Sequence, residues 1–266
     1  FTTRRYDMLE RIKGGAILFP LLFVLVVGGK LLYFTAFILS LLGLKEMYSV
    51  FRIKGFNPIS IVAICSCTLA LIHNIFTIPT YITVLSYFSL FVYTATLVIC
   101  NIHNILDLGI TILGALYIII PFECIIKVYE INNQSFNLAW IIFFIAFSND
   151  IFAYFIGKNF GKRKLIPNVS PNKTIEGSIG GVLGTAAVLS LLSIVVGFNM
   201  GIMIIVAILG SILAQIGDLF ASSIKRYSGV KDFSNMIPGH GGIVDRFDSI
   251  LFVAPLILIL AYFICA

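Results

Sequence analysis

Seven charged side chains lie close together in one stretch of the sequence, from Ser222 to Asp248, which also contains a Pro-Gly-His-Gly-Gly turn. The whole chain is 59% hydrophobic and only 11% charged, so this concentration of charge is unusual within it. Cations bind phosphate groups, and carboxylates bind the metal ions that bridge phosphates. The stretch therefore indicates phosphoryl or nucleotidyl transfer. Its charged residues are Lys225, Arg226, Lys231, Asp232, Asp245, Arg246 and Asp248.

Two further carboxylates, Asp150 and Asp218, lie within long apolar runs. A carboxylate inside a membrane costs roughly 3 kcal/mol even on lenient insertion scales. Asp150 lies eight residues before Lys158 and Asp218 lies seven residues before Lys225, so both have a similar expected depth. A shared polar cavity explains this match. The alternative is that each acid pairs separately with a neighbouring helix.

Polar residues around Asp218 recur at steps of three and four, which places them on one face of a helix. A polar face of this kind is unfavourable against lipid, so it should face the protein interior or water. We therefore expect this helix to line the cavity. The residues are Ser211, Gln215, Asp218, Ser222 and Lys225.

Asp245 and Asp248 are three residues apart near the start of the last apolar run. They could simply cap that helix, because a helix N-terminus favours negative charge. Together with Asp218 they could instead form an oxygen-only site suited to Mg²⁺. Spacing alone leaves both interpretations open.

Two other segments could bind anions. The turn at His240, Gly241 and Gly242 can bring several backbone N–H groups to one anion. His240 could donate to a phosphate, or it could be an ordinary polar loop residue. The loop 158–173 adds five cations and the sequence Ser170-Pro171-Asn172-Lys173.

The composition predicts an integral membrane protein, since mean hydropathy is +1.06 and a spanning helix needs about 20 apolar residues. We expect an all-α polytopic bundle of about nine transmembrane helices forming a single membrane domain, 1–266, with N-terminal spans in 1–140 and catalytic spans and cytosolic loops in 141–266. Basic residues fall in four clusters, which the positive-inside rule places in the cytosol together with the N-terminus. For the first two clusters, topology signalling alone is a sufficient explanation. The expected spans are 14–29, 31–51, 59–78, 81–100, 108–126, 138–157, 177–198, 201–224 and 249–265.

Two smaller patterns predict packing rather than chemistry. Glycines at 177, 180, 181 and 184 should let two helices approach closely. Glu123 and Lys127 are four residues apart, which predicts an ion pair at the end of a span.

The stretch from Ser223 to Asp248 resembles the diagnostic motif of the phosphatidate cytidylyltransferases, in particular Lys231-Asp232, Pro238-Gly239-His240-Gly241-Gly242 and Asp245-Arg246-x-Asp248. A second stretch, from Asp150 to Gly177, also resembles this family. It departs from the family pattern at Ile151 and at Asn172, where a lysine is common, so one possible phosphate contact is missing. The resemblance is strong over the C-terminal half of the chain and rests on hydropathy alone over the first 140 residues.

The resemblance implies an enzyme that condenses CTP with phosphatidic acid to give CDP-diacylglycerol and pyrophosphate in phospholipid synthesis. It implies a homodimer in a bacterial inner membrane, with membrane lipids around it, no nucleic acid partner and an active site facing the cytosol. We expect Asp218, Asp245 and Asp248 to hold Mg²⁺, with Asp150 as a fourth candidate and a second cation such as K⁺ beside it. The expected catalytic residues are these three acids with Lys225 and Arg226. Substrate binding is assigned to Asp150, Ser170, Lys173, Ser222, Ser223, Lys231, His240, Gly241, Gly242 and Arg246.

Two other functions compete with this one. A related membrane enzyme could use a different acceptor, such as a polyprenol or an ether lipid. An ion-coupled transporter could use Asp150 and Asp218 as coupling sites, but it would need access from both membrane faces. Almost all the charge is expected on one face, which favours one-sided chemistry.

Overall fold

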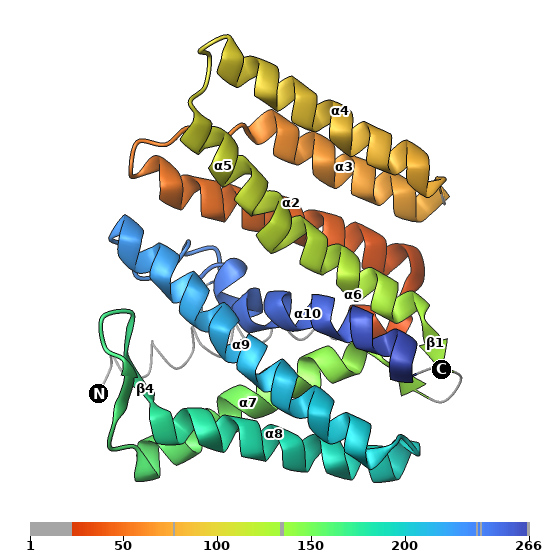
Figure 1. Ribbon diagram of the computed structural model, residues 1–266, viewed down its shortest axis with the longest axis vertical. Helices are drawn as coiled ribbons and strands as arrows, with labels where there is room; N and C mark the ends of the chain where they lie inside the picture. Colours follow the sequence, from red (N-terminus) through yellow and green to blue (C-terminus); the bar gives the residue numbers. More distant parts are fainter. Residues whose placement is uncertain (1–22, 77, 134–135, 238, 240, 265–266) are drawn as a thin grey trace. The chain divides into compact units, whose positions relative to one another are not determined.

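The computed structural model describes residues 23–76, 78–133, 136–237, 239 and 241–264. These residues are nearly all helical and form two compact units (Figure 1). The first unit takes in Phe1–Glu123 and Tyr227–Arg246, and the second takes in Cys124–Arg226 and Phe247–Ala266. The predicted single domain, 1–266, stays a prediction, and each unit is described separately.

The first unit consists mainly of helices that pack through apolar faces. Gly114 makes one approach close, because a Cβ there would lie 2.6 Å from Tyr48 Oη. At the start of α5, the Asn104 side chain accepts the Asp107 N–H at 2.9 Å and Asp107 accepts the Asn104 N–H at 3.2 Å, which satisfies the first N–H groups of the helix. The helices are α2 (Gly29–Arg52), α3 (Ser60–Phe76), α4 (Thr80–Ile99), α5 (Ile105–Gly114), the π-helical turn η1 (Ala115–Ile119) and the start of α6 (Ile120–Glu130).

The second unit is built on a close pair of helices, α7 (Ala139–Phe160) and α8 (Ile175–Val196). A Cβ at Gly180 would lie 2.5 Å from Ile156 Cδ1, and one at Gly184 would overlap the Phe152 ring. The glycine pattern of residues 177–184 therefore serves helix packing, as predicted. Helices α9 (Met200–Ser228) and α10 (Val244–Ile264) complete the unit, apart from their ends that belong to the first unit.

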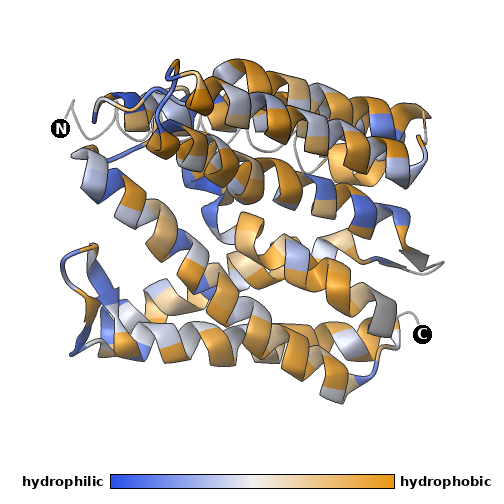
Figure 2. Ribbon diagram, turned by 45° about the horizontal axis from the view of Figure 1, so that its top comes forward, coloured by the Kyte–Doolittle hydropathy of each residue, from blue (hydrophilic) through white to orange (hydrophobic). Residues whose placement is uncertain are grey.

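Six of the described helices are long and apolar enough to cross a membrane. Most ribbon positions on these helices are hydrophobic, whereas hydrophilic residues gather in the loops and near helix ends (Figure 2). The chain is therefore an integral membrane protein. The count of nine spans and the cytosolic N-terminus stay predictions, and most of the first expected span, 14–29, lies outside the described residues.

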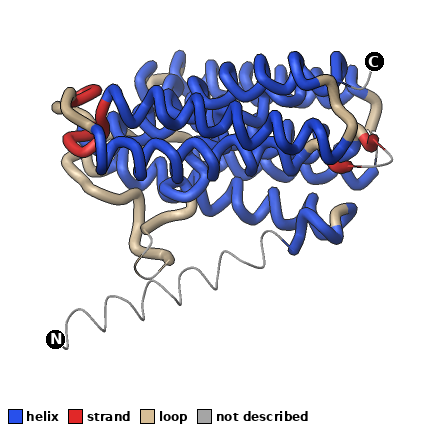
Figure 3. Tube along the Cα trace, turned by 90° about the horizontal axis from the view of Figure 1, so that it is seen from below, coloured by secondary structure: helices blue, strands red, loops and turns tan. Residues whose placement is uncertain are grey.

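The predicted all-α fold is confirmed for the described residues, which are nearly all helical, and two short hairpins that the sequence did not indicate connect helices (Figure 3). Strands β1 (Asn132–Asn133) and β2 (Phe136–Asn137) form one hairpin, and β3 (Lys164–Ile166) and β4 (Ser170–Thr174) form the other. The second hairpin lies within the predicted basic loop. The backbone N–H and C=O groups of its two strands hydrogen-bond to each other. Apolar periodicity in the sequence does not predict these strands.

Two local predictions are wrong. Helix α9 continues to Ser228, beyond residue 224 where the predicted span ends, so Lys225 and Arg226 both lie in its last turn. The predicted Glu123–Lys127 pair does not form. Glu123 instead accepts hydrogen bonds from Asn74 Nδ2 at 2.8 and 3.1 Å, and Lys127 pairs with Glu130 at 2.9 Å.

Candidate active site

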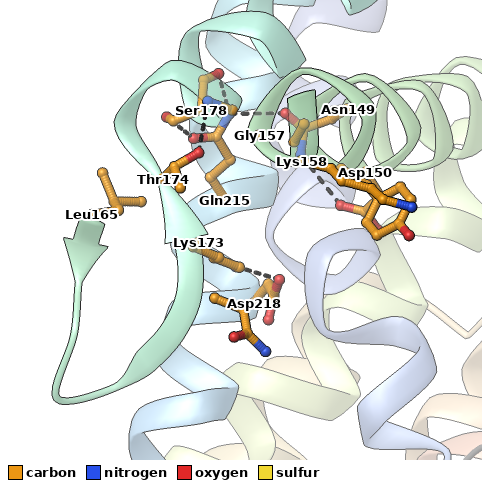
Figure 4. Close-up of a pocket in the computed structure, with 14 residues that line it drawn as sticks. Asn149, Asp150, Gly157, Lys158, Leu165, Lys173, Thr174, Ser178, Gln215 and Asp218 are labelled. Carbon is orange, nitrogen blue, oxygen red and sulfur yellow. Dashed lines mark hydrogen bonds and ion pairs between the residues drawn. The ribbon is translucent and has the colours of Figure 1, made fainter. Parts of the chain in front are cut away.

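A cavity of about 410 Å³ lies in the second unit and contains both of the acids predicted within spans, Asp150 and Asp218 (Figure 4). Helices α7, α8 and α9 and the hairpin strand β4 contribute to its lining. Its volume falls in the range of small-molecule sites. The prediction that Asp150 and Asp218 share a cavity is therefore confirmed.

One wall of the cavity is fixed by a side-chain network around Gln215 (Figure 4). The Gln215 amide nitrogen donates to Asn149 Oδ1 at 2.9 Å and to the Ser178 carbonyl at 3.0 Å. The Ser178 hydroxyl donates to the Gln215 amide oxygen. These bonds join α7, α8 and α9, so the amide of Gln215 holds three helices in register.

The hairpin β3–β4 is attached to α7 and α8 by short contacts. Thr174 caps α8 by accepting the Gly177 N–H at 3.1 Å. Glu176 accepts the N–H groups of Lys162 and Arg163, at 3.0 and 3.2 Å to Oε2. A Cβ at Gly161 would overlap backbone and the Thr174 side chain, so the turn into the hairpin needs glycine. These contacts place strand β4, and with it Lys173, at the cavity.

Lys173 forms an ion pair with Asp218 across the cavity (Figure 4). The two side chains are 29% and 28% exposed, so both can reach a ligand in the cavity. Ser222, one turn after Asp218 on α9, donates to Asp218 Oδ1 at 3.4 Å. Lys173 of the basic loop and Ser222 of the polar helix face, predicted from separate segments, therefore meet at the Asp218 carboxylate.

Asp248 lies near the ion pair of Lys173 and Asp218, and we call Asp150, Lys173, Asp218, Lys225 and Asp248 the charged cluster. The carboxylates of Asp218 and Asp150 and the ammonium group of Lys225 all interact with Asp248 electrostatically. Helix α10 approaches α9 closely here, because a Cβ at Gly217 would lie 2.5 Å from the Asp248 carbonyl oxygen. The polar face predicted along α9 is turned inward: Ser211, Ser222 and Lys225 are buried.

Three other predicted residues of the second unit have different surroundings. The Arg226 guanidinium donates to the Val169 carbonyl at 3.3 Å, between the hairpin strands. The exposed Ser223 donates to the Leu219 carbonyl at 2.8 Å. Ser170 is partly buried at the start of β4 and does not line the cavity.

Asp245 lies in the first unit and has backbone partners. Its Oδ2 accepts the N–H of Phe233 and the N–H of Gly242, both at 2.9 Å, and the residue is 8% exposed. Gly241, at φ +84°, closes the glycine turn through an antiparallel bridge with Ile237. The N–H groups of Gly241 and Gly242 are thus used within the protein, while His240 lies outside the described residues.

Glu46, on α2, is a residue that the sequence analysis missed. It is 2% exposed and accepts hydrogen bonds from Ser234, Ile243 and Val244. The only signal in the sequence is a carboxylate in a largely apolar run, far from the motifs. Lys231 and Arg246, two predicted phosphate ligands, are exposed in the same unit.

The predicted metal ligands are therefore divided between two environments, with Asp218 and Asp248 in the charged cluster and Asp245 in the first turn of α10, which belongs to the first unit. Among the residues that the structure describes, no three His, Cys, Asp or Glu side chains form a ready-made metal site. Asp218 and Asp248 still supply the hard oxygen donors that Mg²⁺ prefers.

Comparisons with known proteins agree with the chemistry of the cavity. Residues 9–264 match the cytidylyltransferase family. A phosphatidate cytidylyltransferase of Bacillus subtilis is 31% identical over 96% of this chain and 97% of its own length. Proteins of the same name from Staphylococcus epidermidis and Staphylococcus haemolyticus are 36% and 37% identical, each over 89% of this chain and 92% of the relative. This chain therefore belongs to the cytidylyltransferase family.

Proposed function

We propose that the chain condenses CTP with phosphatidate, giving CDP-diacylglycerol and pyrophosphate in phospholipid synthesis. Family membership over residues 9–264 supports the cytidylyl transfer, and similarity to phosphatidate cytidylyltransferases supports phosphatidate as acceptor. The observation that carries the proposal is the cavity in which Asp150, Asp218 and Lys173 lie together inside an apolar helical unit.

The reaction needs little acid–base chemistry from the protein. An anionic phosphate oxygen of phosphatidate attacks the α-phosphorus of CTP, a new P–O bond forms, and the bond to the β-phosphate oxygen breaks. Pyrophosphate leaves with the electron pair of that bond. The remaining tasks are positioning and neutralisation of phosphate charge. We assign these tasks to Lys173, which pairs with Asp218, and to Lys225, both in the second unit.

Mg²⁺ fits the donor set of the charged cluster. It commonly binds one or two carboxylates together with substrate phosphates, and Asp218 and Asp248 would be those carboxylates. When bound, the ion neutralises charge on the triphosphate. Asp245, whose carboxylate also accepts two backbone N–H groups, remains a proposed third ligand. K⁺ is proposed as a second cation beside Mg²⁺.

The remaining predicted residues are proposed as phosphate and head-group contacts. Lys231 and Arg246 are exposed cations of the first unit, and Arg226 lies beside the hairpin of the second. Ser170, Ser222, Ser223, His240, Gly241 and Gly242 complete the proposed set.

We further propose a homodimer with about nine spans, a cytosolic N-terminus and an active site that faces the cytosol of a bacterial inner membrane. The four basic clusters support this orientation under the positive-inside rule. Cysteine-accessibility labelling of residues in the loops tests the orientation, and light scattering of the purified protein in detergent tests the dimer.

Pyrophosphate release by purified protein in detergent micelles tests the reaction. We expect release only when CTP, Mg²⁺ and phosphatidate are all present, and none from a folded Asp218→Asn variant. Polyprenol and ether-lipid acceptors are assayed in parallel with K⁺ present. Release with one of these acceptors but not with phosphatidate would reject the proposed acceptor.

A further inference from the structure

Glu46 is the most deeply buried of the described carboxylates, and it lies outside the cavity of the second unit. Glu46 is 2% exposed, and its neighbour Met47 on helix α2 is also buried. A buried carboxylate is costly unless hydrogen bonds compensate for its lost hydration. The hydrogen-bond partners of Glu46 therefore indicate its structural role.

All the hydrogen bonds that Glu46 accepts from other elements come from one distant part of the chain. Ser234 Oγ donates to Oε1 at 2.6 Å, Ile243 N–H donates to Oε1 at 3.0 Å, and Val244 N–H donates to Oε2 at 3.0 Å. Ser234 also accepts the Met236 N–H at 3.2 Å. The Glu46 side chain on α2 is thus hydrogen-bonded to residues on both sides of the glycine turn. We call residues 231–246, which contain this turn, the 231–246 segment.

The contact suits a negative charge. Val244 is the first residue of α10, and the N-terminal N–H groups of a helix have no partners within the helix. An anion there is stabilised by these groups and by the helix dipole. Gly242 permits the approach, because a Cβ at this position would lie 2.5 Å from Glu46 Oε2.

Asp245 supports the same segment from within. Its carboxylate accepts hydrogen bonds both from Phe233, which precedes the glycine turn, and from Gly242, the last residue of that turn. Glu46 and Asp245 together accept five hydrogen bonds from this segment. Glu46 connects the segment to helix α2 of the same unit.

We infer that Glu46 is a positioning residue, which holds the 231–246 segment on helix α2 and so sets where Lys231, Asp245 and Arg246 are presented to the phosphates of the substrates. Glu46 acts through the segment and need not touch substrate. The kinetic part of this inference rests on the proposed function, whereas the structural part does not.

Glu46→Gln is the sharpest test, because it removes the charge and keeps the shape. Glu123→Gln is the matched control, since Glu123 is a partly buried acid of the same unit that accepts hydrogen bonds from the Asn74 side chain. Amide hydrogen exchange of peptides covering residues 233–246 is measured by mass spectrometry. We expect exchange to be roughly tenfold faster in Glu46→Gln and unchanged in Glu123→Gln.

Steady-state pyrophosphate release separates positioning from general destabilisation. In Glu46→Gln we expect kcat to fall about tenfold or more, with the KM for CTP changed less than kcat. The change also weakens three buried hydrogen bonds, so its thermal midpoint should fall, and rates are compared at a temperature where this variant and Glu123→Gln are both folded. Ser234→Ala, which breaks one contact, should give a smaller effect. The double variant should be no worse than Glu46→Gln, because both changes disrupt one contact network.

The inference is overturned if exchange over 233–246 is the same in Glu46→Gln and wild type, whatever the kinetics. It is also overturned if exchange rises but kcat stays at the wild-type value. Should Glu46→Gln fail to fold, Ser234→Ala carries the same comparison. If wild-type protein released no pyrophosphate with phosphatidate, the proposed function would fail while the exchange result still decided whether Glu46 holds the segment.

Discussion

The two units use carboxylates in different ways. In the second unit, Asp218 meets the side chains of Lys173 and Ser222, and Asp248 interacts with other charged side chains. In the first unit, Glu46 and Asp245 accept mostly backbone N–H groups. A carboxylate that pairs with a cation in a cavity can exchange this partner for a ligand. A carboxylate that accepts backbone N–H groups instead stabilises the fold. The partners of an acid therefore say more about its role than its position in a motif.

The largest effect is expected for Asp218→Asn. The change removes the charge that Lys173 and a bound metal would share, so pyrophosphate release should fall by at least about 100-fold. The thermal midpoint should change little, because the ion pair is partly exposed and such pairs contribute little stability. Activity within tenfold of wild type would contradict the role given to the second unit.

Asp245→Asn should differ from Asp218→Asn in stability. Both variants should lose most activity, but Asp245→Asn also weakens two buried charge-assisted hydrogen bonds. We expect a loss of roughly 1–3 kcal/mol in the free energy of unfolding. Denaturant titration in detergent measures it, and equal stabilities of the two variants would remove the distinction between the units.

Gly242→Ala tests the contact between the 231–246 segment and α2 from the opposite side. The added methyl group would press on the Glu46 carboxylate, so we expect activity to fall about tenfold. Gly109→Ala is the matched control, because a Cβ there meets nothing within 4 Å. Pyrophosphate release by both variants is compared, and equal activities would show that the approach to Glu46 is not close enough to matter.

The smallest effect is expected for Gln215→Ala. This change breaks the network that joins α7, α8 and α9 but leaves the charged side chains in place. The KM for CTP should rise a few-fold, while kcat changes less. A variant with wild-type KM would show that the cavity wall does not need this network.

Helical periodicity made part of the site predictable. Steps of three and four residues placed Asp218, Ser222 and Lys225 on one inward face, and the structure confirms that face. The glycines at 180 and 184 predicted close packing for the same reason. These features depend on residues within one helix, where spacing in the sequence fixes spacing in the structure.

The missed features depend on contacts between distant residues. Glu46 is separated from Ile243 by 197 positions, and no local pattern connects them. Asp245 and Asp248 looked equivalent in sequence, and only their partners distinguish them. The hairpin β3–β4 escaped notice because its strands are only three and five residues long and lie among cations.

The most direct test of the account is the Mg²⁺ dependence of pyrophosphate release at saturating CTP and phosphatidate, in wild type, Asp248→Asn and Glu46→Gln. Asp248→Asn should be inactive or need far more Mg²⁺, because it removes a proposed ligand. Glu46→Gln should lower the maximal rate and shift the Mg²⁺ concentration for half-maximal rate much less than Asp248→Asn, because it acts on the proposed third ligand, Asp245, only through the 231–246 segment. A wild-type Mg²⁺ curve for Asp248→Asn, or an equally large shift for Glu46→Gln, would contradict the division of roles between the two groups of acids.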